Sequence, residues 1–214
     1  MNIINSIKKK IILYRFKRLK NKNFSIICNN CWAGNIYQAT GIKYLTPTIG
    51  LFFYMPCYIK FLENFNYYLN VKLRFIKQSK YEIVNNIRRK EWYPIADLGG
   101  IEIQFLHYNN EEDANNKWEK RKKRINKDNL FFVGSERDFC TEKLIRRYQN
   151  LPFENKIFFT ANRYDNDKSL IQIKEFENEK IVGDIWPDQL KIHQYFDVYN
   201  WLEDKKVKLL YIED

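Results

Sequence analysis

Short apolar runs recur along this chain, and polar or amphipathic segments separate them. Runs of this kind lie at residues 24–28, 130–133 and 156–160, with a weaker one at residues 170–173. A short apolar run bounded by polar residues is typical of a strand that is buried on both faces. We therefore predict a strand at each of these positions.

Helical periodicity characterises most of the segments between these runs. Pro56 opens a segment whose apolar residues recur every three or four positions, which predicts one core-facing helix. Those apolar residues are Ile59, Leu62, Phe65 and Leu69. Further helices are predicted at residues 35–40, 111–124, 141–148 and 195–202. Asn109 or Asn110 can cap the helix at 111–124, and Thr141 can cap the next one.

Two more strands, at residues 93–98 and 101–106, are predicted to meet at the tight turn Gly99-Gly100. From Phe24 to Thr160 strands then alternate with helices, a pattern typical of a mostly parallel sheet covered on both faces. The predicted fold class is α/β, with three layers: a mostly parallel sheet and helices on both of its faces. A basic N-terminal helix is predicted in addition.

The length of 214 residues fits one large domain, and no linker rich in Pro, Gly or Ser divides it. We predict a single α/β domain at residues 23–214, preceded by an arm at residues 1–22. The formal net charge is +11, but eight Lys and Arg residues lie in the arm, which has no acid, so the remainder carries only +3. This asymmetry argues against nucleic acid as a partner of the domain.

The arm combines its basic residues with apolar residues at roughly helical spacing. The apolar positions include Ile4, Ile7, Ile11 and Ile12, with Tyr14 or Phe16, and the basic ones include Lys8, Lys9, Lys10, Arg15, Lys17 and Arg18. A basic amphipathic helix of this kind suits an anionic membrane surface. The alternative is a helix that packs on the domain and exposes a solvated outer face.

No apolar stretch is long enough to cross a membrane, because Lys43, Pro47, Gly50 and Pro56 interrupt the longest one. A signal peptide is not expected, because basic residues are spread through the arm. We expect a cytoplasmic protein, peripheral on the inner face of the cell membrane if the arm binds lipid.

Cysteine usage indicates free thiols rather than disulfides, because a chain of this size with a large aromatic core needs no covalent staple. The cysteines are Cys28, Cys31, Cys57 and Cys140. Cys28 and Cys31 have the spacing of a redox or metal-binding pair, but Cys28 lies in an apolar run and no second pair follows. We expect no metal.

Polar clusters follow several predicted strands, at residues 29–34, 107–108, 135–138 and 160–162. Ligands of open parallel sheets bind beyond the carboxyl ends of the strands, so these clusters are expected to meet at one cleft. The residues expected to line that cleft are Asn30, Cys31, His107 and Asp138.

The first cluster offers amide donors from Asn29 and Asn30, and Gly34 lets the chain approach a ligand closely, so this loop can hold an oxyanion or a phosphate. Cys31 is a candidate nucleophile if His107 lies near it, since a thiolate needs a base or a positive field to form. The alternative is that an Asn caps the following helix and that Cys31 packs as a small apolar residue.

His107 is a candidate general base, and the alternative is a structural histidine with buried hydrogen-bond partners. Arg137 and Asp138 are expected to orient that histidine or to bind an anionic group, unless they form an ordinary surface ion pair.

Arg121 interrupts an apolar helical stripe that contains Ala114, Trp118 and Ile125. A guanidinium on a half-buried face is expected to bind a carboxylate or a phosphate. The alternative is that the side chain extends to solvent along Trp118.

Several motifs occur together and in a fixed order: residues 29–34 (NNCWAG), 46–53 (TPTIGLFF), 105–108 (FLHY), the spaced set from Ala114 to Asn126, and 137–141 (RDFCT). As a set they resemble the bacterial family called domain of unknown function 1919, often labelled exopolysaccharide or capsule biosynthesis protein. The resemblance runs from about Phe24 to Leu202, with the arm outside it. It implies a three-layer α/β fold and a surface-polysaccharide setting, and it brings no established catalytic residues.

Together these features favour a transferase that modifies a sugar or glycan intermediate during bacterial exopolysaccharide or capsule assembly, with acyl transfer favoured over glycosyl transfer. The expected donor is an acyl or nucleotide-sugar compound. His107 is the expected base, Asn29 and Asn30 the oxyanion donors, and Arg121 and Arg137 the anion holders. The alternative is a non-catalytic sugar- or partner-binding protein of the assembly machinery, because the sequence lacks a Gly-rich phosphate loop and a G-x-S-x-G elbow.

Overall fold

A computed structural model describes residues 3–164, 167–183 and 189–210 of the chain. Its helices are α1 (Ile3–Lys17), α2 (Trp32–Thr40), α3 (Met55–Glu63), α4 (Phe65–Asn70), α5 (Glu82–Arg88), α6 (Glu111–Lys122), α7 (Glu142–Gln149), α8 (Gln189–Tyr195) and α9 (Val198–Asp204), with a 3-10 turn at Lys174–Phe176. Its strands are β1 (Ser25–Cys28), β2 (Arg74–Phe75), β3 (Ile95–Asp97), β4 (Glu102–Gln104), β5 (Leu130–Ser135), β6 (Lys156–Thr160) and β7 (Leu170–Gln172).

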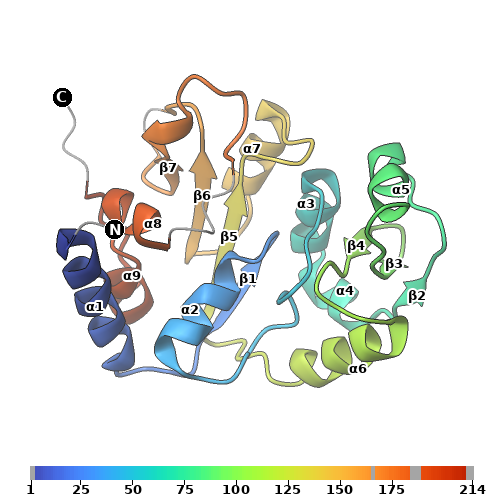
Figure 1. The fold of residues 1–214 in the computed structure, drawn as a ribbon, viewed down its shortest axis with the longest axis horizontal. Helices are drawn as coiled ribbons and strands as arrows, with labels where there is room; N and C mark the ends of the chain where they lie inside the picture. Colours follow the sequence, from blue (N-terminus) through green and yellow to red (C-terminus); the bar gives the residue numbers. More distant parts are fainter. Residues whose placement is uncertain (1–2, 165–166, 184–188, 211–214) are drawn as a thin grey trace.

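The main sheet has the strand order β1-β5-β6-β7, and each pair of neighbours is parallel (Figure 1). Its strands coincide with the four apolar runs of the sequence, so the predicted strands at those runs are confirmed. All four carboxyl ends lie at the same edge of the sheet because every strand runs in the same direction.

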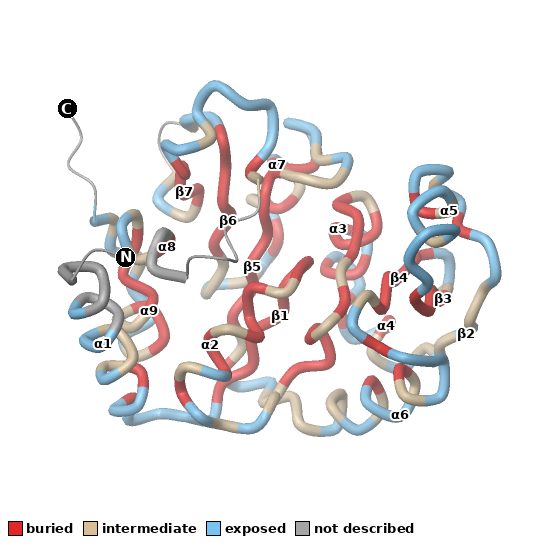
Figure 2. The backbone as a smooth tube through the Cα atoms, in the orientation of Figure 1, coloured by how far each residue is buried: buried red, intermediate tan, exposed pale blue. Residues whose placement is uncertain are grey.

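Helices cover both faces of the main sheet. Neighbouring residues of a strand point to opposite faces, and Phe131 and Phe132 of β5 accordingly belong to two different core clusters. Phe131 packs with Trp201 of α9 on one face, and Phe132 lies on the other face with α3 and α7. Figure 2 shows the strands as buried segments between these helices. The predicted α/β fold class is therefore confirmed.

A second, smaller sheet has the order β2-β3-β4 and is antiparallel. The expectation that the strand beginning near Ile101 joins the parallel sheet was wrong. Gly99 and Gly100 have φ angles of +62° and +90°, torsions that glycine adopts without strain, and they turn β4 back along β3. Phe52 extends this sheet, because its N–H donates to the carbonyl of Gln104 at 2.9 Å.

Most predicted helices are present, with different boundaries. The single helix predicted from Pro56 is two helices, α3 and α4, because Asn64 leaves helical geometry at φ −127° and ψ 42°. Asn is prone to such breaks because its side chain competes with backbone hydrogen bonds. Asn110 caps α6 by accepting the N–H of Asp113 at 2.8 Å, as predicted. Thr141 likewise caps α7.

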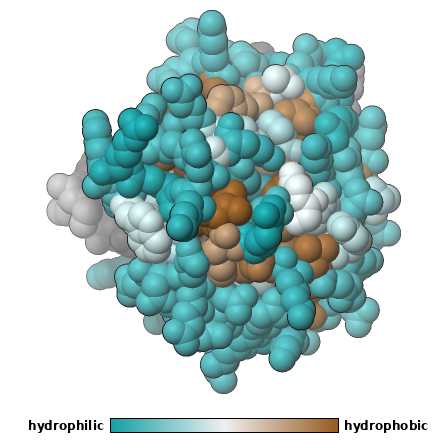
Figure 3. Space-filling view, turned by 90° about the vertical axis from the view of Figure 1, so that its right-hand side faces the viewer, coloured by the Kyte–Doolittle hydropathy of each residue, from teal (hydrophilic) through white to brown (hydrophobic). Residues whose placement is uncertain are grey.

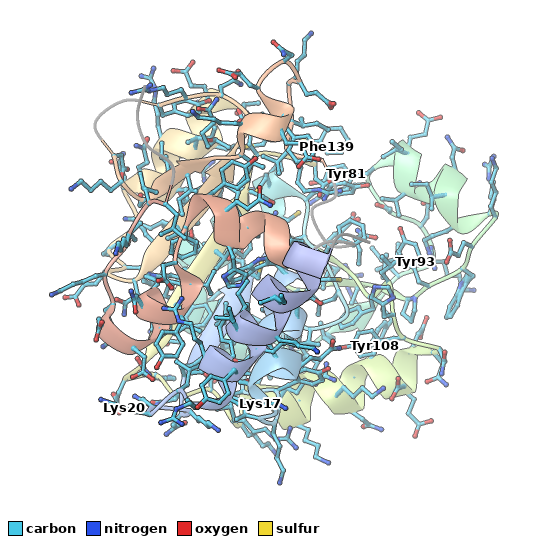
Figure 4. The ribbon with its side chains drawn as sticks, turned by 60° about the vertical axis from the view of Figure 1, so that its left-hand side comes forward. Lys17, Lys20, Tyr81, Tyr93, Tyr108 and Phe139 are labelled. Atoms are coloured by element: carbon cyan, nitrogen blue, oxygen red, sulfur yellow. The ribbon has the colours of Figure 1, made fainter. Side chains whose placement is uncertain are left out.

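The N-terminal helix α1 packs on the domain beside α2 and α9 (Figure 1). Phe16 and Leu19 are buried at its end, and Arg15 pairs with Asp197 at 2.9 Å. Its outer side still exposes large apolar residues, namely Ile7, Ile11 and Tyr14, and its end carries exposed Lys17, with Lys20 beyond it (Figure 4). The side chains of Ile4, Lys8 and Lys9 lie outside the described part. No helix within that part is long and apolar enough to cross a membrane.

Candidate functional site

A cleft of about 620 Å³ lies where the carboxyl ends of β1 and β5 face the small sheet and α5. The residues expected to share a cleft line it together, and Arg137 lies with them. Those residues are Asn30, Cys31, His107 and Asp138. His107 reaches the cleft from the segment after β4 of the small sheet, and not from a strand of the parallel sheet as the sequence suggested.

His107 is held at the cleft by its backbone and by its neighbours. Its N–H donates to the carbonyl of Gly50 at 3.0 Å, and a Cβ at Gly50 would lie 3.4 Å from that of His107 and 3.2 Å from the ring of Tyr108. Tyr108 is buried, and its hydroxyl donates to the carbonyl of Ile49 at 2.5 Å. These contacts fix the backbone on both sides of the histidine.

The imidazole of His107 is exposed, and none of the described residues forms a hydrogen bond with it. A structural histidine would have buried partners, so this geometry differs from the structural alternative. An imidazole that no described residue engages is available to exchange a proton with a ligand in the cleft.

Cys31 lies half-buried directly before α2, with its Sγ 4.0 Å from the carbonyl of Leu51. The four cysteines are free thiols. Burial raises the pKa of Cys28 to about 12, and burial with the nearby Glu136 raises the pKa of Cys140 to about 12. Both of these thiols stay protonated near neutral pH. Cys31 is the cysteine that lines the cleft.

The two asparagines after β1 have different positions. Asn30 lines the cleft, and its Oδ1 accepts the N–H of Trp32 at 3.1 Å while its Nδ2 donates to the hydroxyl of Ser135 at 2.9 Å. Asn29 is fully buried, and its Nδ2 points to Met55 Sδ at 3.5 Å. Asn29 therefore does not reach the cleft, because successive residues at a strand end point to opposite sides.

Much of the hydrogen-bonding capacity at the start of α2 is used within the protein. The N–H of Gly34 donates to the carbonyl of Cys31 at 3.0 Å, and the N–H of Trp32 is taken by Asn30. Gly34 has open space on its outer side, since a Cβ there would meet no atom within 4 Å. The loop leaves room for a ligand, but the N–H groups of Trp32 and Gly34 already have acceptors within the protein and are not free to bind an oxyanion.

Arg137 and Asp138 form an ion pair of 3.1 Å, with side chains that are 22% and 24% exposed. Asp138 and the following Phe139 have φ angles of 55° and 64°, which is rare for residues with a side chain. This bend directs the exposed Phe139 ring toward the small-sheet side, where it stacks on Tyr81 with centroids 5.4 Å apart (Figure 4).

Apolar side chains form much of the cleft, including four that are 43% to 52% exposed. These four are Ile83, Ile87, Phe139 and Ile181. Figure 3 shows hydrophobic surface among hydrophilic side chains on the face turned toward the viewer. Sequence reasoning missed this apolar wall, although Ile83 and Ile87 have the four-residue spacing that places both on one side of a helix.

A second hollow, of about 340 Å³, lies beside the first and shares Cys31 and His107 with it. Its lining includes the polar and cationic side chains of Asn35, Gln38, Lys117 and Arg121, beside Gly34, Ile49 and two tyrosines. Cys31 and His107 therefore stand at the boundary between a mainly apolar cleft and a cationic hollow. We call these two spaces the apolar cleft and the cationic hollow.

Arg121 is held firmly in the cationic hollow. Its Nη1 donates to the carbonyl of Ile49 at 3.1 Å and to the hydroxyl of Tyr108 at 2.6 Å, and its guanidinium lies 5.0 Å from the Tyr44 ring centroid. Within the described chain no carboxylate pairs with it. Trp118 is fully buried, so Arg121 is fixed by tyrosines rather than extended along the tryptophan.

Within the described ranges no group of three His, Cys, Asp or Glu side chains is arranged so that it could hold a metal ion. The residues able to hold a cofactor are those of the cationic hollow, which favour an anion.

Comparison with known proteins gives the chain a family but no activity. It is 33% identical over 189 residues to an uncharacterized protein of Haemophilus influenzae, and the match covers 86% of each chain. The family model described as "Domain of unknown function (DUF1919)" matches residues 2–203. The expectation that the arm lies outside the family resemblance was wrong, and the packing of Phe16 and Arg15 shows why α1 is part of the fold. The chain belongs to the DUF1919 family.

Proposed function

We propose that this chain is a transferase that moves an acyl group from an activated donor to a hydroxyl group of a sugar intermediate in exopolysaccharide or capsule assembly. The observation that carries the proposal is the position of His107, whose imidazole has no hydrogen-bond partner among the described residues and lies with Cys31 at the boundary of two hollows. The two adjoining hollows meet at this imidazole, so a ligand that reaches their boundary is held next to the group that would move a proton.

In the proposed reaction the imidazole of His107 takes the proton of the acceptor hydroxyl. The hydroxyl oxygen then attacks the acyl carbonyl carbon, and the bond between that carbon and the donor's leaving group breaks. The imidazolium returns the proton to the leaving group, so the histidine acts as base and then as acid. In a two-step version the thiol of Cys31 gives its proton to His107 and its sulfur attacks the acyl carbon, while the bond to the donor's leaving group breaks and that group takes the proton from the imidazolium. The acceptor hydroxyl then gives its proton to His107 and takes the acyl group, and the sulfur of Cys31 regains a proton from the imidazolium.

An acyl group is favoured over a glycosyl group because the cleft beside His107 is lined with exposed isoleucines and aromatic rings. Hydrocarbon surface of this kind favours an apolar group over a polyhydroxylated one. The sugar acceptor enters the proposal through the resemblance to surface-polysaccharide proteins. The setting that follows is the cytoplasmic side of the cell membrane.

The second candidate is a non-catalytic protein that binds a sugar or a partner. One observation favours it: Asn29 is buried away from the cleft and the N–H groups of Trp32 and Gly34 already have partners, so the predicted oxyanion donors are largely occupied. A transferase normally aims free donors at the developing oxyanion.

The test of the proposed function is His107→Gln, with His193→Gln as the matched control on α8. We expect incorporation of labelled acyl groups into sugar acceptors to fall by about a hundredfold or more in His107→Gln. The melting temperature of His107→Gln is expected to stay unchanged, because the imidazole is exposed and has no described partner. His193→Gln should retain acyl transfer.

Unchanged incorporation by His107→Gln would defeat the catalytic assignment. A wild-type protein that transfers no label from any acyl thioester, yet binds sugar acceptors, would favour the binding protein instead.

A further inference from the structure

The cationic hollow and the apolar cleft differ in chemistry but meet at the same two side chains, Cys31 and His107. We propose that the donor is an anionic amphiphile, with a phosphate group held by Arg121 and a hydrocarbon chain lying along Ile83, Ile87 and Phe139. This inference deepens the proposed function and rests on it, since it names the chemical class of the donor.

The state of Arg121 supports a phosphate. A guanidinium has five N–H groups, and among the described residues only its Nη1 is engaged, by Ile49 and Tyr108. The Nε and Nη2 groups can therefore still donate, and together they present the planar fork that binds phosphate oxygens in pairs. The two existing bonds and the Tyr44 ring fix the guanidinium in place before a ligand arrives.

The rest of the cationic hollow is consistent with an anion. Lys117 lines it and is already paired with Asp113 at 2.7 Å, so its charge is largely balanced. Asn35 and Gln38 add neutral amide donors. No Asp or Glu belongs to the lining of this hollow, so no described carboxylate there would repel a phosphate. Arg121 is thus the charged group best placed to bind it.

The apolar cleft supports a hydrocarbon chain. Ile83 and Ile87 from α5 expose 52% and 43% of their surface, and Phe139 exposes 52%. Phe139 is held in this position by stacking on Tyr81 and by an edge contact with Tyr54 at 4.9 Å. Apolar surface that a rigid bend keeps in a cleft favours an apolar ligand, because water gains no hydrogen bonds there.

The boundary that the two spaces share brings the middle of such a ligand next to the side chains proposed to react. A molecule with its phosphate at Arg121 and its chain along α5 must pass Cys31 and His107, which line both spaces. Two sources have this chemistry: a long-chain acyl thioester of a phosphorylated carrier, which is the donor of the proposed reaction, and a sugar linked to an isoprenoid through phosphate, which would occupy the same spaces as the acceptor.

The experiment is calorimetric titration of the full chain with octyl, decyl and dodecyl phosphate below their micelle concentrations, with inorganic phosphate and decanol as partial ligands. We expect affinity to rise about fourfold for each added methylene, and decyl phosphate to bind more tightly than either partial ligand. Arg121→Gln should weaken decyl phosphate at least tenfold and leave decanol binding unchanged.

A double variant, Ile83→Ser with Ile87→Ser, should flatten the dependence on chain length and leave inorganic phosphate binding unchanged. Both isoleucines are exposed, so this variant is expected to fold even if Arg121→Gln does not. The matched controls are Arg146→Gln, an exposed arginine of α7, and Ile11→Ser, an exposed isoleucine of α1. Neither control should change the binding of decyl phosphate.

Competition against decyl phosphate separates the two sources. Stronger competition by lauroyl-coenzyme A supports the thioester, and stronger competition by farnesyl phosphate supports the isoprenoid. Equal affinity for all three chain lengths, or no competition by either compound, overturns the proposal. This experiment measures binding, and the His107→Gln experiment measures acyl transfer. The binding result therefore stands if the transferase hypothesis fails, and the transferase hypothesis stands if the amphiphile does not bind.

Discussion

Asp138 and Phe139 carry the most unusual backbone in the cleft, with consecutive φ angles in the left-handed region. Asp tolerates this region because its short side chain hydrogen-bonds locally, whereas an aromatic residue pays about 1 kcal/mol or more. Two contacts offset that cost. The carbonyl of Asp138 accepts the N–H of Met55 at 3.0 Å, and the Phe139 ring stacks on Tyr81.

Substitutions at Asp138 separate the effect of its backbone conformation on stability from the effect of its charge. Asp138→Asn should keep the unfolding free energy within about 0.5 kcal/mol, since Asn is also tolerated at positive φ. Asp138→Ala should lower that free energy by about 1 kcal/mol, because its Cβ is strained there and no polar side chain compensates. Urea denaturation measures both values.

If Asp138→Asn loses acyl transfer but keeps its stability, the Asp138 carboxylate helps to position the site through its ion pair with Arg137. Equal stability of the Asn and Ala variants would contradict the strained backbone.

At this scale the sequence predicts the polar half of the site and misses the apolar half. Asn30, Cys31 and Asp138 are predictable because polar residues that directly follow buried strands gather at one edge of a parallel sheet. Asn29 was wrongly expected there because the strand's alternation buries it. Ile83 and Ile87 were missed because an exposed apolar residue looks the same in a sequence as a core residue.

Among the elements, α1 combines the two arrangements that the sequence left open. Its inner side packs on the domain through Phe16, while Ile7, Ile11 and Tyr14 are 53%, 54% and 60% exposed on the outside. Spacings of four and three place these residues on one side of the helix. Removal of residues 1–22 would therefore also uncover the core, and a sharper test keeps Phe16 and changes only the exposed side.

Ile11→Ser combined with Tyr14→Ser should weaken binding to anionic vesicles about tenfold or more, because the apolar contact with the lipid is lost. Binding of the wild type should weaken with added salt, since Lys17 and the other basic residues contribute electrostatic attraction. Co-sedimentation with phosphatidylglycerol vesicles measures both effects. Tyr67→Ser is the matched control, because Tyr67 is also 60% exposed but lies on α4.

Equal sedimentation of wild type and the double variant would exclude the outer side of α1 as the contact, and tighter binding of the wild type to RNA than to vesicles would exclude a membrane partner. The melting temperature is expected to stay unchanged in both variants, because the substituted side chains are exposed.

Helix and strand positions were more predictable than their connections. The caps Asn110 and Thr141 were identified because their oxygens precede helix-forming segments by the spacing that caps need. The short elements β2 and α5 were not, since two- to seven-residue segments give too few repeats for a periodicity. Of these two elements, α5 contributes Ile83 and Ile87 to the wall of the cleft.

For the molecule as a whole, the first helix, α1, packs against the last two helices, α8 and α9 (Figure 1). His193 lies in this contact, 5.4 Å from the Phe16 ring. Burial is the main cause that lowers the pKa of His193 to about 4, while Asp197 acts to raise it and Arg15 to lower it. The imidazole is therefore neutral in the folded protein at neutral pH.

This shift predicts how stability depends on pH. In the unfolded chain His193 regains an ordinary pKa of about 6.5, so between pH 6.5 and 4 the unfolded state binds a proton that the folded state does not. The contribution of His193 to the unfolding free energy should thus be complete above pH 6.5. The unfolding free energy should fall as the pH drops toward 4. Urea titrations at pH 7, 5.5 and 4.5 measure that fall. In His193→Gln, which cannot titrate, the fall should be smaller. Identical slopes in wild type and His193→Gln would show that other groups control the acid sensitivity of the fold.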